Sequence, residues 1–338
     1  MATIKEIAKL AGVSRGTVDR VLNNRGMVNP DTANKVKEIA NALNYKPNKA
    51  GLILSAQKKK LKLGVILFGA NNPFFDDVIK GINEKSKELE SYNCTIKIKS
   101  IPLCIDEQLK SIDEFVNEGI NGIALTPYND KKIVSKINEL YDMGIPVVTL
   151  NTDIEGSKRL AYVGSNYYDS GKTAAGLINI ITKGDVNLGI VSGSKNVMCH
   201  SERISGLKDC IKKNYPHIKV IDTVYNDDDD IKSYELTSRL LENKDINALF
   251  FVAGGVYGGC SAVISSKKEN NITSISFDNV PTTKKMIENG LIKATICQQP
   301  ELQGSKPLDI LFSYLSTGEQ PKKEHNYLRL DIRIKENM

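Results

Sequence analysis

Apolar residues follow helical spacing three times in the first 45 residues of the chain, at the intervals of three and four that bring side chains to one helix face. The three stripes are Ile4-Ile7-Ala8-Ala11, Val18-Val21-Leu22 and Val36-Ile39-Ala40-Leu43. Gly12 separates the first two stripes, Ser14 can cap the second helix by accepting a backbone N–H, and Asn29 with Pro30 can open the third. The pattern predicts a compact three-helix unit over residues 1–46.

The pattern changes at residues 47–61. Pro47 ends the helical register, a short apolar patch of Gly51, Leu52, Ile53 and Leu54 follows, and lysines close the segment. A flexible linker does not need an apolar patch. The segment is therefore predicted to be a linker that carries an apolar patch.

From residue 62 to residue 338, short β-rich runs such as KLGVILF and ALFFVAG alternate with amphipathic runs such as NDKKIVSKINELYDMG. This alternation is typical of parallel sheets with helices on both faces. About ten strands divide more naturally into two doubly wound lobes than into one sheet. We predict an α/β fold with lobe N at about 62–163 and 293–325 and lobe C at about 164–292 and 326–338. The alternating segment YLRLDIRI, residues 327–334, is predicted to be one late strand.

Charge separates the head from the body. Residues 1–62 hold 13 Lys/Arg and 4 Asp/Glu, whereas the rest of the chain holds 33 and 36. A basic head on a near-neutral body indicates a polyanionic partner, either nucleic acid or an acidic membrane surface. The opening MATIKEIAKL lacks the apolar core of a signal peptide, and no apolar run approaches a membrane span. We expect a cytoplasmic protein that does not enter a membrane.

Catalytic and metal-binding patterns are weak. The six cysteines form no CxxC pair and are expected to be reduced and mostly buried, and the three histidines lie far apart. The chain has no GxSxG, Walker loop or HExxH, and AGGVYGG does not have the spacing of a dinucleotide loop. The acidic run at 227–230 is interpreted as a solvated cluster before a helix. We therefore expect no enzyme activity, no metal and no cofactor.

Two short helices joined by a turn at Gly12 match the helix-turn-helix pattern, whose second helix enters the major groove. TIKEIAKLAGVSRGTVDRVLNNRG, followed by the third helix and NYKPN, resembles the DNA-binding head of the lac/gal repressor family over residues 3–57. The resemblance implies that Arg15, Gly16 and Arg20 reach base edges. An arginine can hold O6 and N7 of guanine, although Arg20 could instead contact phosphate. The predicted DNA-binding residues are Ser14, Arg15, Gly16, Thr17, Asp19, Arg20, Asn23, Asn48 and Leu54.

Two positions of the second helix are unusual. Gly16 costs about 1 kcal/mol in a helix interior, but it leaves room for Arg15 or for a closer approach to the groove. Asp19 stands where the family commonly has a small hydroxyl residue, and we expect it either to accept from a cytosine N4 or to pair with Arg15. The resemblance also implies that residues 48–56 fold into a hinge helix on DNA and that Leu54 wedges into the minor groove.

In the body, NNPFFDDVIKG, VGSNYYDSGKTAAG, ERISGL, SFDNVP and KATICQQP resemble, in this order, the sugar-binding periplasmic receptors of type I. The resemblance covers most of residues 62–315 and implies a polyol ligand, because aromatic faces stack on sugar C–H surfaces and charged or amide groups bind hydroxyls. Its ligand positions lie at strand C-termini. They are Asn72, Phe74, Phe75, Asn151, Arg203, Asp278 and Gln298.

Several alternatives and departures limit this assignment. One of the two phenylalanines could belong to the core, and Arg203 with Asp278 could form only a buried structural ion pair. Asn151 and Thr152 stand where ribose-type receptors carry an Asp-Arg pair. SNYYD has Asn166-Tyr167 for a common Asp-Asn pair, and AGGVYGG lacks the usual asparagine-aspartate. The sequence therefore predicts a small sugar or sugar derivative without naming it.

The combined interpretation is a sugar-responsive transcription factor, expected to be a repressor, that binds a pseudo-palindromic operator in double-stranded DNA as a homodimer. One alternative is a sugar-binding receptor or transport component whose basic head is incidental. A nucleotide-binding oxidoreductase with a DNA head is a further alternative, and the missing phosphate loop argues against it.

Overall fold

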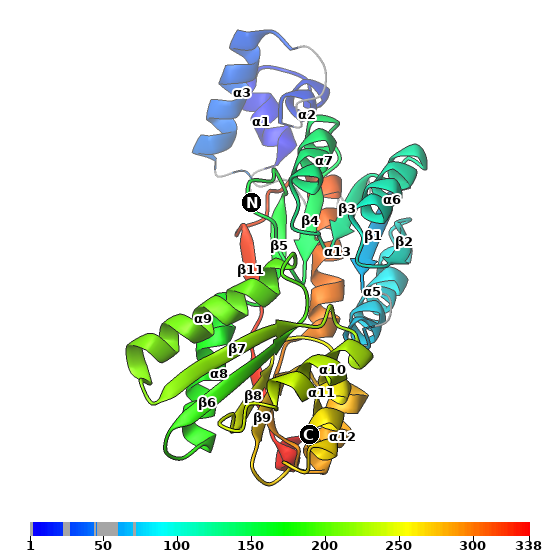
Figure 1. The fold of residues 1–338 in the computed structure, drawn as a ribbon. Helices are drawn as coiled ribbons and strands as arrows, with labels where there is room; N and C mark the ends of the chain where they lie inside the picture. The colour runs from blue at the N-terminus through cyan, green and yellow to red at the C-terminus, as the bar shows by residue number, and fades with distance from the viewer. Residues whose placement is uncertain (1–2, 23–27, 44, 46–59, 70–71) are drawn as a thin grey trace. The chain divides into compact units, whose positions relative to one another are not determined.

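The computed structural model describes residues 3–22, 28–43, 45, 60–69 and 72–338. The chain divides into two compact units, Met1–Ser55 and Ala56–Met338, and we describe each by itself as the head and the body (Figure 1). Within the described ranges, no helix is long and apolar enough to cross a membrane.

The head contains the three helices that the apolar spacing predicts: α1 (Ile4–Ala11), α2 (Arg15–Leu22) and α3 (Pro30–Ala42). Thr3 and Glu6 form a capping box at the start of α1, and Gly12 ends this helix with φ of 72°, a conformation that glycine adopts without strain. The predicted stripes form the core of the head. Leu43 is the exception, because it caps α3 and is exposed.

The first lobe of the body is a six-stranded sheet in the order β11-β5-β4-β3-β1-β2, and every pair in it is parallel. Its strands are β1 (Lys62–Phe68), β2 (Thr95–Ile101), β3 (Gly122–Leu125), β4 (Val147–Leu150), β5 (Ala161–Gly164) and β11 (His325–Tyr327). Its helices are α5 (Phe74–Glu90), α6 (Ile105–Asn117), α7 (Lys131–Asp142) and α13 (Pro300–Thr317).

The second lobe repeats this plan in the order β12-β10-β9-β8-β6-β7. Its strands are β6 (Val186–Ser192), β7 (Ile218–Tyr225), β8 (Ala248–Phe251), β9 (Thr273–Phe277), β10 (Ile292–Cys297) and β12 (Asp331–Arg333). Its helices are α8 (Tyr167–Ile181), α9 (Met198–Asn214), α10 (Asp230–Leu240), α11 (Val256–Ser265) and α12 (Pro281–Glu288). Only β12 pairs antiparallel to its neighbour among the described strands of this sheet. The predicted α/β class with two doubly wound lobes is confirmed.

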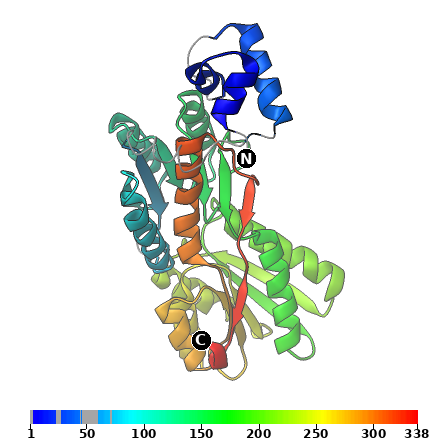
Figure 2. The same cartoon turned by 180° about the vertical axis from the view of Figure 1, so that it is seen from behind.

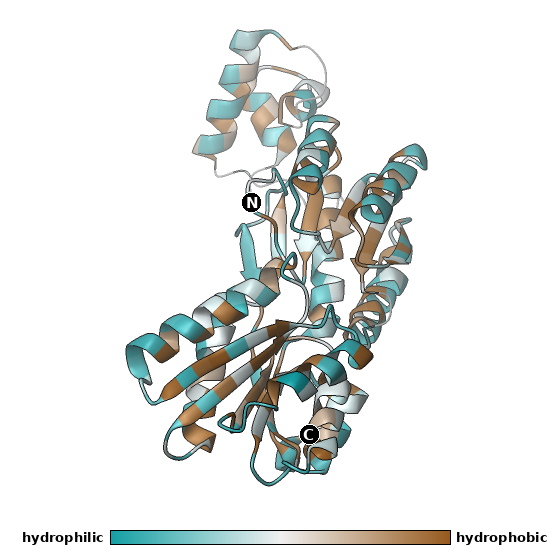
Figure 3. Cartoon of the chain, in the orientation of Figure 1, coloured by the Kyte–Doolittle hydropathy of each residue, from teal (hydrophilic) through white to brown (hydrophobic). Residues whose placement is uncertain are grey.

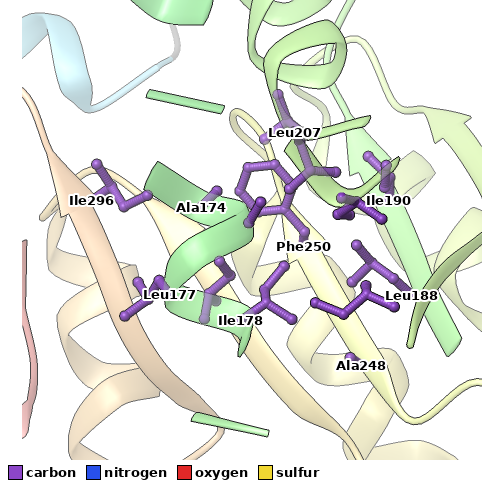
Figure 4. Packing of buried hydrophobic residues seen from close by; sticks show 14 of the residues in the cluster. Ala174, Leu177, Ile178, Leu188, Ile190, Leu207, Ala248, Phe250 and Ile296 are labelled. Atoms are coloured by element: carbon purple, nitrogen blue, oxygen red, sulfur yellow. The ribbon is translucent and has the colours of Figure 1, made fainter. Parts of the chain in front are cut away.

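Strands covered on both faces explain the nearly continuous apolar runs of the sequence. In Figure 3 the central strand β1 is mainly brown, whereas the edge strand β7 is banded brown and teal, β11 is teal, and the helices alternate between brown and teal. Figure 4 shows the second-lobe core, in which Leu188, Ile190 and Phe250 of the sheet meet Ile178 of α8 and Leu207 of α9. Full burial of each such large side chain contributes about 1.5–3 kcal/mol.

The first lobe crossing, after β5, lies where the sequence pattern predicts it, but the two later crossings lie further along the chain. β10 pairs with β9 in the second lobe, so the chain returns to the first lobe only at α13. The segment predicted as one strand over 327–334 is two short strands, β11 in the first sheet and β12 in the second. Figure 2 shows this red segment running from one lobe to the other. Alternation of apolar and polar residues gives a strand's face, but not the sheet with which it pairs.

The six cysteines are free thiols, four of them buried, as expected from their spacing. Burial raises the pKa of the Cys94 thiol to about 11 and that of the Cys260 thiol to about 12. These two cysteines are therefore neutral at physiological pH and act as small apolar core residues.

Helices α5 and α13 approach each other closely in the first lobe. A Cβ added at Gly81 of α5 would overlap the carbonyl oxygen of Glu301, and one added at Gly304 of α13 would overlap the carbonyl oxygen of Val78. Each helix therefore presents a glycine to the backbone of the other. Helix α5 begins at Phe74 and α13 begins just after Gln298, so this contact fixes two elements that border the candidate site.

Gly81→Ala is expected to destabilise the protein by about 1–3 kcal/mol, because the two helix backbones must move apart. Gly176→Ala on α8 is the matched control. There the new methyl group would lie 3.7 Å from the Tyr215 hydroxyl, and the change should stabilise by about 0.5–1 kcal/mol. Urea unfolding of both variants measures the difference. Equal effects in the two proteins would contradict a tight α5–α13 contact.

Candidate functional site

All seven residues predicted to bind a ligand line one cavity of about 70 Å³ between the two lobes of the body. Asn72, Phe74, Phe75 and Asn151 come from the first lobe, and Arg203, Asp278 and Gln298 come from the second. Parallel strands place their carboxyl ends at the same edge of a sheet. The two sheets thus contribute residues that are up to 226 positions apart, from Asn72 to Gln298, to one space.

Arg203 dominates the charge of the cavity. Its side chain on α9 is only 2% exposed, and the guanidinium carbon lies 3.8 Å from the ring centroid of Phe277 and 4.7 Å from that of Tyr167. One terminal nitrogen donates to the Val252 carbonyl at 2.6 Å, but the buried Nε has no hydrogen-bond partner among the described residues. An unpaired buried donor is costly, so the site is chemically prepared for an added acceptor.

Asp278 follows β9 and faces the same cavity. Burial raises the pKa of its carboxyl group, whereas the charge of Arg203 and a hydrogen bond from Gln298 oppose that rise. Among the described residues, Arg203 donates to the Val252 carbonyl and Asp278 accepts from Gln298, and no ion pair joins the two charged groups. The alternative of a closed structural ion pair is therefore disfavoured, and both charged groups keep hydrogen-bonding capacity for a ligand.

Gln298 is held in one orientation by its neighbours. Its Oε1 accepts from the Tyr167 hydroxyl at 2.8 Å and from Gln303 Nε2 at 3.3 Å, and its Nε2 donates to Asp278 at 2.8 Å. Gln303 in turn accepts from Asn151 Nδ2 at 3.1 Å. These bonds fix which amide atoms remain available at Gln298 and Asn151. Tyr167, which departs from the ribose-type pattern, thus helps to fix the orientation of Gln298 by donating to it.

The two phenylalanines at the start of α5 are both largely buried and meet edge to face, with ring centroids 5.4 Å apart. Phe75 also packs edge to face against Phe68 of β1 at 6.1 Å. Phe75 is therefore continuous with the core, while both rings border the cavity. Asn72 accepts from the Phe74 backbone N–H at 3.0 Å and so supports the first turn of this helix.

Strained backbone gathers at the strand ends around the cavity. Asn151, Asp227, Asp228 and Asp278 all have positive φ, between 52° and 67°, and all line the cavity. Residues other than glycine rarely adopt this conformation, which costs on the order of 1–3 kcal/mol per residue. Such strain commonly marks a site whose geometry serves binding.

The acidic run at 227–230 is not only a solvated cluster. Asp227 and Asp228 line the cavity, and Asp228 accepts the Gly254 N–H at 2.9 Å. A Cβ at Gly254 would lie 2.9 Å from the Cβ of Asp228, so this aspartate uses space that a side chain at position 254 would need. Gly254 of the AGGVYGG segment therefore leaves the space that Asp228 of the acidic run occupies. The position after β7 was the sequence signal that could have identified Asp228.

Sequence reasoning also missed Cys199 and His200 at the start of α9. Both are buried and line the cavity. His200 Nδ1 lies 3.2 Å from the Ser194 carbonyl oxygen, while the Cys199 backbone N–H donates to Thr152 of the other lobe at 3.2 Å. Their proximity depends on how the two lobes meet, which no local pattern encodes.

In the head, α2 carries five of the predicted DNA-binding residues, namely Arg15, Gly16, Thr17, Asp19 and Arg20. Ser14 caps it by accepting the Thr17 N–H at 3.1 Å, as predicted, and Val18 and Val21 are buried toward the core. Arg15, Gly16 and Arg20 are exposed. Arg20 Nε donates to the Gly16 carbonyl at 3.3 Å, so this arginine lies back along its own helix in the free protein.

Gly16 has no packing requirement within the head. The nearest atom to an added Cβ would be Ser14 Oγ at 3.7 Å, so a larger side chain would fit the free protein. Packing within the head therefore does not account for the glycine, and its contact with the groove stays a prediction. Asp19 is half-buried, and its charge adds to the burial that raises the pKa of Tyr45. Asn23, Asn48 and Leu54 lie outside the described residues.

The two parts of the chain match two known families. Residues 3–48 match the family described as "Bacterial regulatory proteins, lacI family", and residues 63–320 match the "Periplasmic binding protein domain". The chain belongs to the lacI family of regulators. Its head is thus a DNA-binding domain, and its body is a periplasmic-binding-protein domain.

Relatives of this lacI-family regulator agree with that organisation. The probable HTH-type transcriptional repressor ExuR of Bacillus subtilis is 29% identical over 83% of this chain and 82% of its own length. The ribose operon repressor of the same organism is 27% identical over 83% and 82%. The solved structure of XylFII is 28% identical, with a TM-score of 0.73, over 81% of this chain and 98% of that one. These relatives support a sugar-responsive transcriptional repressor.

Asp278→Asn is expected to stabilise the sugar-free regulator at pH 7 and to weaken ligand binding. The fold raises the pKa of this carboxyl group, so folding favours its neutral form and the wild-type protein loses stability as pH rises through that pKa. The asparagine does not ionise and can still accept from Gln298. Urea unfolding should therefore show a stability gain at pH 7 that shrinks toward pH 4. A gain that is the same at both pH values would contradict the charge explanation.

Proposed function

We propose that this lacI-family protein is a cytoplasmic repressor that binds a pseudo-palindromic operator as a homodimer and is controlled by a monosaccharide. The observation that carries the proposal is the cavity in which an under-bonded guanidinium, Arg203, faces the carboxylate of Asp278 and two oriented amides. A monosaccharide offers hydroxyls that both donate and accept, which satisfies acceptor and donor groups side by side. No catalytic step is part of the proposal.

The size and charge of the cavity favour a small uncharged sugar. Its volume of about 70 Å³ is far below the roughly 300–1,000 Å³ of pockets for drug-sized ligands. Asp228 and Asp278 outnumber the guanidinium of Arg203 along the wall, whereas Asp227 is paired with Lys232. These two carboxylates would repel the negative charge of a phosphoryl group, so phosphorylated sugars should bind more weakly than neutral ones.

Control of DNA binding would operate through the angle between the lobes. Contacts already join the two lobes, since the Asn129 N–H donates to the Asn196 carbonyl at 3.1 Å and Asn196 Nδ2 donates to the Tyr128 hydroxyl at 3.0 Å. A ligand that bonds both lobes shifts the population of closed bodies. By linkage, operator and sugar must then alter each other's affinity by the same factor.

An exposed apolar face of the second lobe supports the homodimer. On the neighbouring helices α10 and α11, Ile231 is 75% exposed, and Tyr257 and Ile264 are 47% and 46% exposed. Gly258 lets α11 approach the Asp230 carbonyl closely, so these side chains belong to adjoining helices. Exposed apolar patches commonly mark interaction surfaces. Two heads on one two-fold axis would also match a palindromic site.

A sugar receptor without a DNA function is the second candidate, because the ribose import binding protein RbsB of Bacillus subtilis is 26% identical over 74% of this chain and 80% of its own length. This second candidate gives no role to the basic head. The two candidates differ in salt dependence, since several phosphate contacts cause the logarithm of DNA affinity to fall linearly with the logarithm of salt concentration.

The decisive experiment is selection of bound sequences from a random duplex pool, with and without a panel of neutral monosaccharides and their phosphates. We expect a palindromic site whose recovery changes with one neutral sugar. Enrichment that no sugar alters would remove the effector half of the proposal. The absence of any enriched site would remove the repressor half and favour the receptor.

Arg15→Ala is expected to weaken operator binding by about 1–3 kcal/mol and to relax base preference at one position of each half-site. Asp19→Ser should change base preference at that or a neighbouring position, because a carboxylate that accepts from cytosine or orients Arg15 would be lost. Selection with each variant measures both effects. Lys37→Ala, an exposed charge change on α3, is the control. If Asp19→Ser kept the wild-type affinity and base preference, the role assigned to Asp19 would be wrong.

A further inference from the structure

Gln303 does not line the cavity, yet it bonds two of the residues that do. Its side chain on α13 is 0% exposed. Its Oε1 accepts from Asn151 Nδ2 at 3.1 Å, and its Nε2 donates to Gln298 Oε1 at 3.3 Å. The buried amide of Gln303 thus connects both side chains. Its oxygen accepts from Asn151 and its nitrogen donates to Gln298.

The polarity of Gln303 is transmitted to the cavity. The side-chain amide of Asn151 donates one hydrogen to Gln303. Its side-chain oxygen, Oδ1, therefore stays available as an acceptor. Gln298 uses its oxygen on Gln303 and Tyr167, so its remaining amide hydrogen is available as a donor. Reversing the Gln303 amide would place donor against donor and acceptor against acceptor. Gln303, which lies outside the cavity, therefore fixes the donors and acceptors that Asn151 and Gln298 present at the cavity wall.

Gln303 also spans the junction of the two lobes. It belongs to the first lobe, because α13 contacts α5, β3, β4 and β5 there and Gly304 packs against the backbone of α5. Gln298 belongs to the second lobe, because it follows β10 and bonds Tyr167 of α8 and Asp278. The Gln303–Gln298 bond is consequently a link between two bodies that must rotate for the cavity to open.

We propose that Gln303 is a positioning residue that sets the hydroxyl pattern accepted by the cavity and ties this pattern to lobe closure. The proposal rests on the sugar-controlled function proposed above. It assigns Gln303 no contact with the sugar. Its effect acts through Asn151 in one lobe and Gln298 in the other, and a change in lobe angle alters the bond between Gln303 and Gln298.

Three variants of the full-length protein test this role. Gln303→Met keeps the side-chain length and removes both bonds, whereas Gln303→Glu keeps the acceptor for Asn151 and replaces only the donor toward Gln298. Gln108→Met is the matched control. Gln108 is 1% exposed and also makes two amide bonds, to Thr126 and Tyr128, but both stay within the first lobe.

The binding measurement is calorimetric titration with D-ribose, D-xylose, D-arabinose, D-glucose, D-galactose and D-allose. We expect each Gln303 variant to lose about ten-fold or more in affinity for the preferred sugar and to change the order of preference. Gln303→Glu should regain affinity as pH falls, because a protonated carboxyl can donate to Gln298, whereas Gln303→Met should not. Gln108→Met should keep the wild-type order. An unchanged affinity and order in Gln303→Met would overturn the proposal.

Hydrogen exchange of the sugar-free proteins supplies a second readout that needs no ligand. In Gln303→Met, amides of residues 150–153 in the first lobe and 277–280 in the second should exchange faster together. In Gln108→Met, faster exchange should stay near residues 126–128. Exchange at both lobe segments that equals the wild type would overturn the role of Gln303 even if no sugar in the panel binds. Failure of the wild-type protein to bind any sugar would instead count against the proposed effector class.

Discussion

The geometry of parallel strands is the constraint on which the rest of this molecule depends. Every parallel strand of a sheet ends at the same edge, and the body places two such edges face to face. Asn151, Asp228, Asp278 and Gln298 each follow a strand and reach the same cavity. Three of these four residues adopt positive φ. The backbone turns sharply where the strand stops, and a short polar side chain is thereby directed into the cavity rather than along the sheet.

Charge burial is the second feature that the cavity imposes. Arg203 is held between two aromatic rings with one carbonyl acceptor, and its Nε lacks a partner among the described residues. Burial raises the pKa of Asp278 near it. Buried charged groups of this kind stabilise the fold less than apolar side chains of similar size would. A ligand hydroxyl that bonds such a buried group removes its free-energy penalty. That gain adds to the binding affinity, and it would be absent if the group were already fully hydrogen-bonded.

The head and the body use opposite designs for recognition. In the body, the polar groups that line the candidate cavity are buried and oriented by other side chains, as the Gln303–Gln298–Asp278 chain of bonds illustrates. In the head, Arg15 and Arg20 are exposed on a short helix, and Gly16 leaves that surface open. A small ligand must be enclosed to be distinguished from its epimers. DNA is read by a convex helix that inserts into a groove, so its recognition residues stay exposed until binding.

The sequence by itself determined the elements and the residue types. Helical spacing in the first 45 residues predicted the three-helix head, including its caps at Ser14 and Asn29, because caps and apolar stripes are local properties. The resemblance of five short motifs to sugar-binding receptors located the seven cavity residues. Only the tertiary structure decided the pairing of β10, β11 and β12, the entry of Asp228 into the cavity beside Gly254, and the link from Asn151 through Gln303 to Gln298. Each of these depends on which chain segments become neighbours when two lobes pack, and that packing energy is summed over the whole fold rather than written in any short stretch.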